Sequence, residues 1–183
     1  MAVRPVRIYG DPVLREKSKD IMSFDDSLRA LVDDLFDTMK AYAGVGLAAN
    51  QVGVAQRVIV VEVPLEDGKM DRIVAINPVL DQRSGKESGE EGCLSMPGIY
   101  EDIPRATQLR LRAFDVDGKP FERIVEDFCA RAVQHEADHL DGVLFTDRVS
   151  PLKKQFLKRE LDALARGELP EGYHPGQGEG GLV

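Results

Sequence analysis

The stretch that most constrains the fold is QHEADHLDGVLF, residues 134–145, which carries two histidines four positions apart. Asp127 is a residue type that caps helix N-termini, and Gly142 is one that ends helices. The sequence therefore predicts a helix from about 127 to 141. One face of this helix holds Phe128, Ala132, His135 and His139, and another, apolar face holds Cys129, Val133, Ala137 and Leu140. A helix that is apolar on two sides is usually buried. Because unpartnered polar groups are costly inside a protein, we expect both histidines to have partners there.

Two histidines at positions i and i+4 of a helix can share one metal ion. Glu136 points about 100° away from His135, so it can approach a bound water rather than the metal. That division suits metal-assisted hydrolysis, in which the ion acidifies the water and a carboxylate takes its proton. The alternative is a polar helix whose histidines hydrogen-bond to neighbours. The helix uses two of the three histidines in the chain and is predicted to be buried, which favours the metal.

A tetrahedral metal needs a third protein ligand besides the two histidines. In proteases with HExxH this ligand lies downstream, where this chain offers Glu160 in its last predicted helix and His174 in a glycine-rich tail. Upstream, Cys93 stands within EEGCLSMPG (90–98), and its thiolate would complete the set and leave one position open for water. Taken alone, Cys93 is better explained as a small core residue. Cys129 keeps that explanation, because it lies on the face opposite the histidines.

A third informative stretch is GVGLAANQVG, residues 44–53. It lacks the third glycine and the preceding strand of a dinucleotide-binding loop, so that interpretation is weak. Its small residues permit close approach of the backbone to another chain or to a ligand. Gln51 supplies a neutral amide donor, which suits a developing oxyanion. Gly44 is also expected to end the preceding helix.

The remaining pattern predicts a short helix at Asp11-Pro12, a helix capped by a Ser23/Asp26 box, and a last helix opened by Ser150-Pro151. Strands are expected at 57–63 and 72–80, followed by a polar loop at 81–92 and a hairpin at 108–125 that turns at Asp117-Gly118. Helices and strands do not alternate as in a parallel sheet. The sequence therefore predicts an α+β fold, with antiparallel strands packed around a central metal-binding helix and a C-terminal helix.

Length and charge narrow the class of protein. The 183 residues suit one domain, predicted at 1–166, and a Gly/Pro-rich tail at 167–183 that we expect to be mobile. The net charge of −8 argues against a protein that adheres to DNA or to anionic lipid. The first residues, MAVRPVRIYG, contain arginines and a proline and are not expected to form a secretory signal, and the longest β-branched run, 58–63, is far too short to span a membrane. With two cysteines and no sign of export, we expect a cytoplasmic protein without disulfides.

Three of these stretches together resemble the peptide deformylase family. Its motifs GxGxAAxQ, EGCLS and HExDH stand here, in that order, as GVGLAANQ (44–51), EGCLS (91–95) and HEADH (135–139). The resemblance runs from about Val6 to the last helix and implies the deformylase fold. It implies an enzyme that removes the formyl group from the N-terminal formyl-methionine of nascent polypeptides and releases formate.

The resemblance also implies a role for each motif residue. Cys93, His135 and His139 would hold one Fe²⁺, which Ni²⁺, Co²⁺ or Zn²⁺ can replace. Glu136 would take a proton from the activated water and pass it to the leaving amine. The Gln51 side chain and the backbone N–H of Leu94 would bind the formyl oxygen.

Substrate contacts follow from the same resemblance. Phe128 and Ala132 would line a methionine pocket beside Val45. The backbones of Val45 and Gly92, with the neighbouring Gly46, would hold an extended peptide as an added strand. Arg131 lies at the edge of this face, and we expect its stem to line the rim while its guanidinium reaches water. Glu91, Arg105 and Asp138 would support the metal ligands or, nearly as well, form surface ion pairs.

Two other functions compete with this interpretation. A zinc endopeptidase would share HExxH but would not need Cys93, and a non-catalytic metal-binding module would leave Glu136 and Gln51 without a task. The last helix, Pro151 to Arg166, has five basic and two acidic residues, so its charge of +3 is opposite to that of the whole chain. It is explained either as a solvated face or as a site that docks on ribosomal RNA. In either case Leu157, Leu161 and Leu164 would pack the helix against the body of the protein and leave its lysines facing outward.

Overall fold

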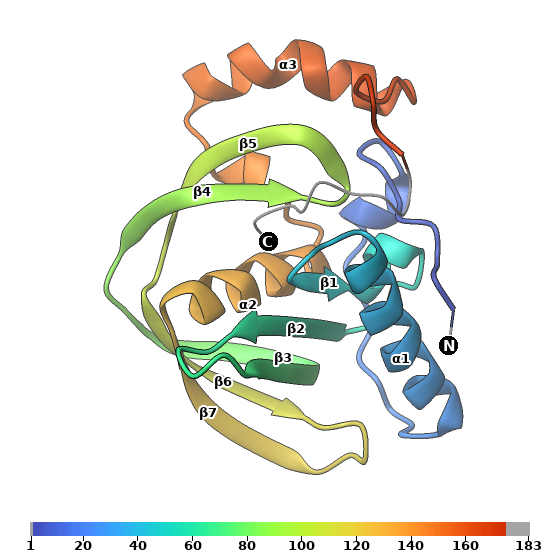
Figure 1. The fold of residues 1–183 in the computed structure, drawn as a ribbon, viewed down its shortest axis with the longest axis vertical. Coiled ribbons are helices and arrows are strands. Elements are labelled where there is room, and N and C mark those ends of the chain that lie inside the picture. Colours follow the sequence, from blue (N-terminus) through green and yellow to red (C-terminus); the bar gives the residue numbers. More distant parts are fainter. Residues whose placement is uncertain (1, 175–183) are drawn as a thin grey trace.

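The structure, a computed structural model, describes residues 2–174 (Figure 1). Its strands form a five-stranded sheet of order β1-β2-β3-β6-β7 and a separate two-stranded sheet, β4-β5, and every neighbouring pair is antiparallel. The strands are β1 Gly46–Ala48, β2 Val58–Pro64, β3 Met70–Ser84, β4 Glu87–Cys93, β5 Met96–Arg105, β6 Gln108–Phe114 and β7 Pro120–Glu126. This arrangement confirms the α+β prediction.

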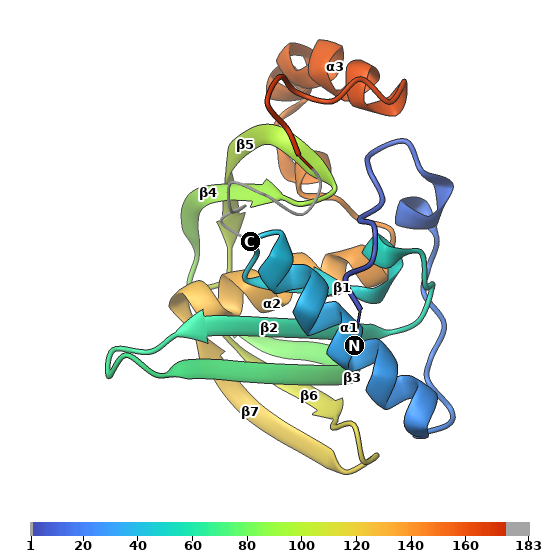
Figure 2. The same cartoon turned by 45° about the vertical axis from the view of Figure 1, so that its right-hand side comes forward.

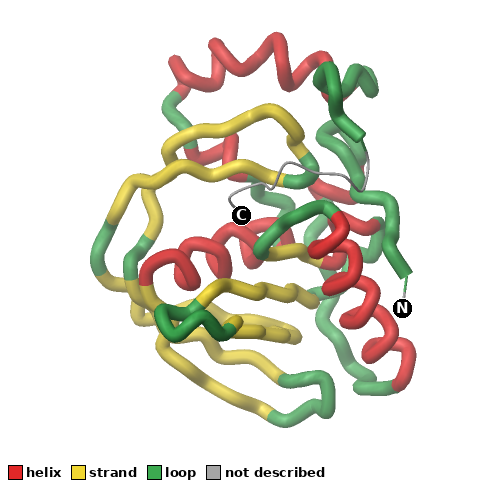
Figure 3. The backbone as a smooth tube through the Cα atoms, in the orientation of Figure 1, coloured by secondary structure: helices red, strands yellow, loops and turns green. Residues whose placement is uncertain are grey.

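Three α-helices complete the fold. They are α1 Asp26–Ala41, α2 Asp127–Leu140 and α3 Pro151–Ala165, and short 3-10 turns occur at Pro12–Arg15, Ala49–Val52 and Phe145–Arg148. Helix α2 runs between the five-stranded sheet and the β4–β5 hairpin, with α1 beside β1 and α3 outside β5 (Figures 1 and 2). The tube in Figure 3 shows α2 with strands on two sides. Strands on two sides of α2 explain why its sequence is apolar on two faces.

Helix α2 is buried because small and branched residues let the strands approach it closely. Ala130, Ala132, Val133 and Leu140 have no exposed surface and pack with β2, β3 and β6 side chains in one core cluster. Cys129 is partly buried against the same cluster, so its predicted place among core residues is confirmed. Burial of this face stabilises α2 at the centre of the fold, since each large apolar side chain removed from water contributes about 1.5–3 kcal/mol.

Helix boundaries differ from the prediction in their caps. Asp25, not Ser23, caps α1: its carboxylate accepts the Leu28 N–H at 3.1 Å, and the Ser23 hydroxyl hydrogen-bonds to Asp25 instead. At the other end the left-handed residue is Ala43, one position before the expected Gly44. Asp127 is the first residue of α2 and Glu126 its N-cap. A one-residue shift of this kind changes the cap but leaves the apolar stripe in register.

The hairpin and most strands were predicted correctly, but the expected loop at 81–92 is wrong. Its residues end β3 and form β4, which pairs with β5 along its whole length. Glu87, Ser88 and Glu90 are exposed, so the polar residues face solvent while their backbone groups bond to β5. This strand could not be recognised in the sequence, because only its last residues, 91–93, are buried and most of the others face solvent.

The last helix begins as predicted, with the Ser150 hydroxyl accepting the Lys153 N–H. Leu161 and Leu164 are buried and Leu157 partly so, whereas Leu152 and Phe156 are 62% and 74% exposed. Of the predicted tail, residues 167–174 continue from α3 through turns, and residues 175–183 lie outside the described part of the chain. Within residues 2–174, no helix combines the length and the apolar character that crossing a membrane requires.

Candidate metal centre and active site

The three predicted metal ligands converge in the buried centre of the molecule. Cys93 ends β4, while His135 and His139 lie on successive turns of α2. Their ligand atoms all lie within 4.8 Å of one another, and the Cys93 Sγ is 3.4 Å from His139 Nε2. All three side chains are buried. One sulfur and two nitrogen donors at this spacing match a site for a transition-metal ion such as Zn²⁺ or Fe²⁺.

The polar atoms left over at this point fit a bound cation. Among the described residues, His135 Nε2 and Glu136 Oε2 are buried without a hydrogen-bond partner. Burial and the neighbouring His135 lower the pKa of His139 well below its ordinary value, so its imidazole is neutral, as a metal ligand must be. Burial, followed by the Glu136 carboxylate, raises the pKa of the Cys93 thiol, and a cation would reverse this and favour the thiolate.

Glu136 lies beside the ligands on α2 and is buried. Burial and the negative charge of Glu91 raise its pKa well above the ordinary value, which is the direction expected for a proton carrier. Gly46 of β1 leaves room for this carboxylate: a Cβ at Gly46 would stand 2.6 Å from Glu136 Oε1. The GxG of the first motif is therefore explained by close approach, as predicted.

The Gln51 side chain is held at the same centre by a backbone N–H three residues earlier in the chain. Its Oε1 accepts the Ala48 N–H at 2.9 Å, which fixes the amide so that Nε2 points toward Cys93 Sγ at 3.6 Å and Ser95 Oγ at 3.1 Å. The amide nitrogen is thus a donor beside the thiolate ligand. Leu94 follows Cys93 directly and is buried against Gly44.

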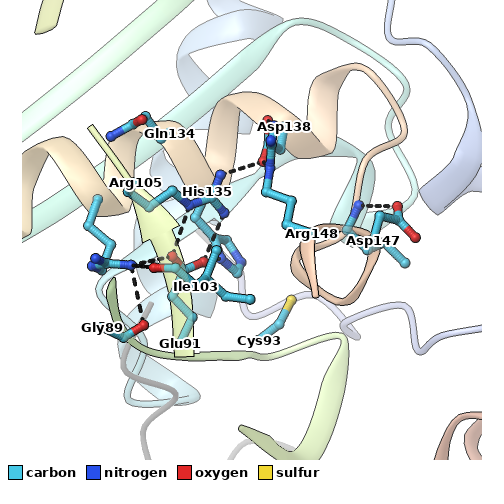
Figure 4. A network of polar contacts seen from close by, with 12 residues as sticks. Gly89, Glu91, Cys93, Ile103, Arg105, Gln134, His135, Asp138, Asp147 and Arg148 are labelled. Carbon is cyan, nitrogen blue, oxygen red and sulfur yellow. Dashed lines mark hydrogen bonds and ion pairs between the residues drawn. The ribbon is translucent and has the colours of Figure 1, made fainter. Parts of the chain in front are cut away.

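His135 is oriented by Glu91, which is fully buried on β4 (Figure 4). His135 Nδ1 lies 2.9 Å from Glu91 Oε1, and Arg105 donates to both carboxylate oxygens at 2.8 and 2.9 Å. Burial alone raises the pKa of Glu91, but hydrogen bonds from Arg105 and His135 outweigh it and lower the pKa to about 2. A permanent carboxylate accepts the Nδ1 proton, and this leaves the Nε2 lone pair for a metal.

Arg131 corrects one prediction. Its guanidinium is turned inward and only 11% of the side chain is exposed: it donates to Glu91 Oε2 at 2.8 Å and to the carbonyls of Ile103, Gly89 and Glu87. A Cβ on Gly89 would stand 3.0–3.2 Å from this guanidinium. The arginine is turned inward because the β4–β5 hairpin, which was not predicted, covers the edge of α2 with backbone acceptors.

Asp138 extends the same network toward the surface (Figure 4). It accepts Arg105 at 2.6 Å and both Nε and an Nη of Arg148 at 2.6 and 2.7 Å. Of the two explanations left open for these residues, support of the metal ligands holds for Glu91 and Arg105, which are buried, rather than surface pairing. Asp138 joins that buried pair to an exposed arginine.

The predicted substrate residues occupy different depths. Ala132 is fully buried, Val45 is partly buried against the same cluster, and Phe128 is 39% exposed. Phe128 lines a cavity of about 200 Å³ together with Gly89 and Arg131. Gly46 lies on β1, the edge strand of the large sheet, and Gly92 on β4, which pairs on one side with β5. Within residues 2–174, each of these strands therefore pairs with a neighbouring strand on one side only, and β4 ends at the ligand Cys93.

Two further polar residues at the site escaped the sequence analysis. Ser95 holds the Gln51 amide, and Asn50 Nδ2 donates to the His139 carbonyl at 2.6 Å. Both lie inside the quoted motifs, Asn50 before Gln51 and Ser95 two residues after Cys93. The signal was therefore their position next to a predicted functional residue.

Comparison with known proteins gives the same family for most of the described residues. The family model "Polypeptide deformylase" matches residues 3–155. A peptide deformylase of Alkalilimnicola ehrlichii is 47% identical over 166 residues, which is 91% of this chain and 93% of that protein. The crystal structure of a peptide deformylase from Thermus thermophilus aligns with a TM-score of 0.84 at 41% identity, over 91% of this chain and 99% of that one.

A second solved structure, a peptide deformylase from Legionella pneumophila, aligns with a TM-score of 0.82 at 42% identity, over 92% of this chain and all of that one. These matches do not favour the zinc endopeptidase or the non-catalytic metal-binding module. The chain therefore belongs to the polypeptide deformylase family and is a hydrolase that removes the N-terminal formyl group from newly made polypeptides.

Proposed function

We propose that Cys93, His135 and His139 hold one Fe²⁺ per chain, and that Ni²⁺, Co²⁺ or Zn²⁺ can replace it. The mixed set of one sulfur and two nitrogen donors supports this assignment, as does the unpartnered His135 Nε2. Three protein donors leave a position for water or substrate, as catalytic metal sites require. When bound, the ion supplies Lewis acidity, which lowers the pKa of a water and polarises the formyl oxygen.

Glu136 carries the proton in this proposal. Its buried Oε2 has no hydrogen-bond partner among residues 2–174, so it is free to accept a proton from the attacking water. The water oxygen bonds to the formyl carbon, the bond from that carbon to nitrogen breaks, and Glu136 passes the proton to the leaving amine. The products are a free N-terminal amine and formic acid, which loses its remaining proton to solvent and leaves as formate. A carboxylate with a raised pKa suits both the uptake and the return of the proton.

Gln51 and Leu94 stabilise the charge that develops on the formyl oxygen. The Gln51 amide is oriented by the Ala48 N–H, and its Nε2 donates to the formyl oxygen in place of its long 3.6 Å contact with Cys93 Sγ. The backbone N–H of Leu94, next to the ligand Cys93, supplies the second donor. A neutral amide is suited to this place because it donates without competing for the metal.

The peptide binds in extended form between β1 and β4. The free edges of these strands support this binding mode, in which Val45, Gly46 and Gly92 contribute backbone groups. The Val45 carbonyl already accepts the Glu62 N–H at 2.8 Å, so its N–H is the group left for the substrate. In this proposal the methionine side chain lies against Phe128, Ala132 and Val45, of which Phe128 is 39% exposed.

We further propose that the enzyme works in the cytoplasm and docks on ribosomal RNA through α3. In this proposal residues 1–166 form the catalytic domain, and the Gly/Pro-rich tail follows from residue 167. The outward position of α3 and the 47–71% exposure of the Lys153, Lys154 and Lys158 side chains support docking. Each of these lysines also lies beside a carboxylate, which weakens the local positive field.

The metal and the activity are tested together. The protein is purified anaerobically, its metals are quantified, and formate release from a formyl-methionyl peptide is measured. We expect about one iron per chain and turnover that survives replacement of iron by Ni²⁺. A fully active enzyme that contains only zinc would overturn the iron assignment.

A further inference from the structure

A second, strongly cationic cavity lies next to the network that supports His135. Its volume is about 380 Å³, and it is enclosed by the turn between β3 and β4, the end of β5, helix α2 and Arg148. The cavity is lined by four cationic side chains, those of Arg83, Lys86, Arg105 and Arg148. It is also lined by one carboxylate, Asp138, and by the Gln134 amide. None of these residues is a predicted metal ligand or a predicted substrate contact.

The positive charge in this cavity is not fully neutralised. Asp138 already accepts hydrogen bonds from Arg105 and Arg148, which leaves Arg83 and Lys86 in excess. Arg83 donates to the carbonyl of Leu80 at 3.0 Å, a neutral acceptor, and Lys86 is exposed. An excess of cations in this cavity is opposite in sign to the net charge of the chain, −8.

The neutral groups of the cavity are occupied, so charge decides what can bind there. Gln134 Nε2 donates to the carbonyls of Ala106 and Ala130, and its Oε1 accepts the Ala106 N–H at 3.1 Å. Arg105, with 4% of its side chain exposed, is fixed by Glu91 and Asp138 and provides a rigid wall (Figure 4). Because its fork is already engaged by these carboxylates, Arg105 contributes positive charge to the cavity rather than a bidentate contact.

We propose that this cavity is a binding site for a phosphate group, either free or carried by an RNA backbone. The volume holds a phosphate together with part of an attached sugar. Arg83 and Lys86 supply the contacts from the end of β3 and the turn that follows it, and Arg148 supplies the contact from the segment before α3. The site is separate from the metal centre, since Glu91 and Arg105 stand between them.

The test measures binding of inorganic phosphate to the Ni²⁺-loaded enzyme at low ionic strength, by calorimetry and by backbone amide shifts of Gly85 and Ala106. The double variant Arg83→Ser, Lys86→Ser should bind about tenfold more weakly or worse, because two charge contacts are lost. Both residues are exposed, so the fold should be retained, which circular dichroism checks. The matched control is Arg112→Ser, Lys69→Ser, which removes the same charges from exposed positions elsewhere.

A short single-stranded RNA separates the two sources of phosphate. Competition between RNA and inorganic phosphate, lost in the Arg83, Lys86 variant, would assign the site to a phosphodiester backbone. Binding of inorganic phosphate without competition by RNA would assign it to a free anion. Equal phosphate affinity in wild type and the Arg83, Lys86 variant, equal weakening in the control, or no saturable binding would each overturn the proposal.

Discussion

Glu91 is the buried carboxylate that contacts His135, one of the three candidate metal ligands. Its carboxylate receives His135 on one side and two arginines, Arg105 and Arg131, on the other. With a pKa of about 2 it stays ionised at any pH at which the enzyme works. The fixed charge sets the tautomer of His135, so that Nε2 is the atom offered to the metal. Orientation of this ligand is therefore determined one layer outside the site.

The two cysteines give the sharpest test of ligand identity at this scale. Cys93→Ala removes the sulfur donor, so metal content should fall sharply, whereas Cys129→Ala should leave it intact because Cys129 packs against the sheet core. Metal per chain is measured after anaerobic purification and desalting. Equal metal content in the Cys93→Ala variant and the wild type would show that Cys93 is not a ligand.

Arg131 should contribute mainly to stability. Arg131→Ala leaves Glu91 with one arginine fewer and leaves the carbonyls of Ile103 and Glu87 without this donor. We expect a loss of roughly 2–4 kcal/mol in the free energy of unfolding, because the guanidinium is largely buried and charged. Urea unfolding measures it. The control Arg112→Ala, at an exposed ion pair with Asp81, should cost less than about 1 kcal/mol. Similar losses in both variants would contradict the buried role.

At the scale of elements, local patterns predicted what is locally encoded. The apolar stripe of α1, the turn at Asp117-Gly118 and the two apolar faces of α2 could be predicted. Each of them depends on residues close together in the sequence or on burial in a core, and both leave a pattern of residue types. The β4 strand was missed because its exposed residues are held by backbone bonds to β5, which leave no mark in polarity. The inward turn of Arg131 was missed for the same reason, since its acceptors are carbonyls of those strands.

Among the site residues, sequence position was enough for those that lie in motifs. The motif resemblance implied one site, and the structure brings together the side chains of Cys93, His135 and His139. Glu136 lies beside them on α2, and Gln51 contacts Cys93. The support around them could only be listed as candidates. Whether Glu91 and Arg105 are buried depends on how β4 and β5 fold over α2, which is a tertiary contact.

The ion pair between Arg15 and Asp147 joins two short elements, Pro12–Arg15 and Phe145–Arg148. Burial raises the pKa of Asp147, but hydrogen bonds from Arg15 and from the Leu144 N–H outweigh it and lower the pKa below its ordinary value. A lowered pKa in the folded state means that the stabilisation is present above the unfolded-state value near 3.9 and disappears as the pH falls through the folded-state pKa.

Asp147→Asn should therefore reduce the free energy of unfolding by roughly 1 kcal/mol at pH 7 and by progressively less below pH 4. Urea unfolding at a series of pH values measures this difference. Asp33→Asn, at an exposed position of α1, serves as the control and should show little change at either pH. A difference between wild type and Asp147→Asn that grows toward low pH would contradict the assigned sign.

At the scale of the whole molecule, charge is distributed unevenly. The chain has a net charge of −8, yet α3 with Arg166 counts +3 and presents Leu152 and Phe156 to solvent. The helix thus lies on the outside of the fold (Figure 2). Its buried residues are Leu161 and Leu164, which pack against the body. This arrangement leaves one long face of α3 open to a large partner.

The docking proposal predicts salt-dependent association with ribosomes. Wild type should co-sediment with ribosomes at low salt and much less at about 200 mM, since phosphate contacts weaken steeply with salt. The variant Lys153→Glu, Lys154→Glu, Lys158→Glu should stay in the supernatant while it still deformylates a free peptide. Reversal of three exposed lysines elsewhere, Lys17, Lys69 and Lys119, is the control. A triple variant of α3 that pellets as well as wild type would rule out docking through this face.

The central claim is that the buried Cys93, His135 and His139 bind the metal while Glu136 moves the proton. The most direct measurement is formate release and metal content of wild type and Glu136→Gln, purified anaerobically side by side. Because glutamine keeps the shape but cannot accept the proton, both proteins should carry the same metal while turnover of the variant falls by about 10²–10⁴. A Glu136→Gln enzyme with full metal content and near-normal turnover would contradict the account.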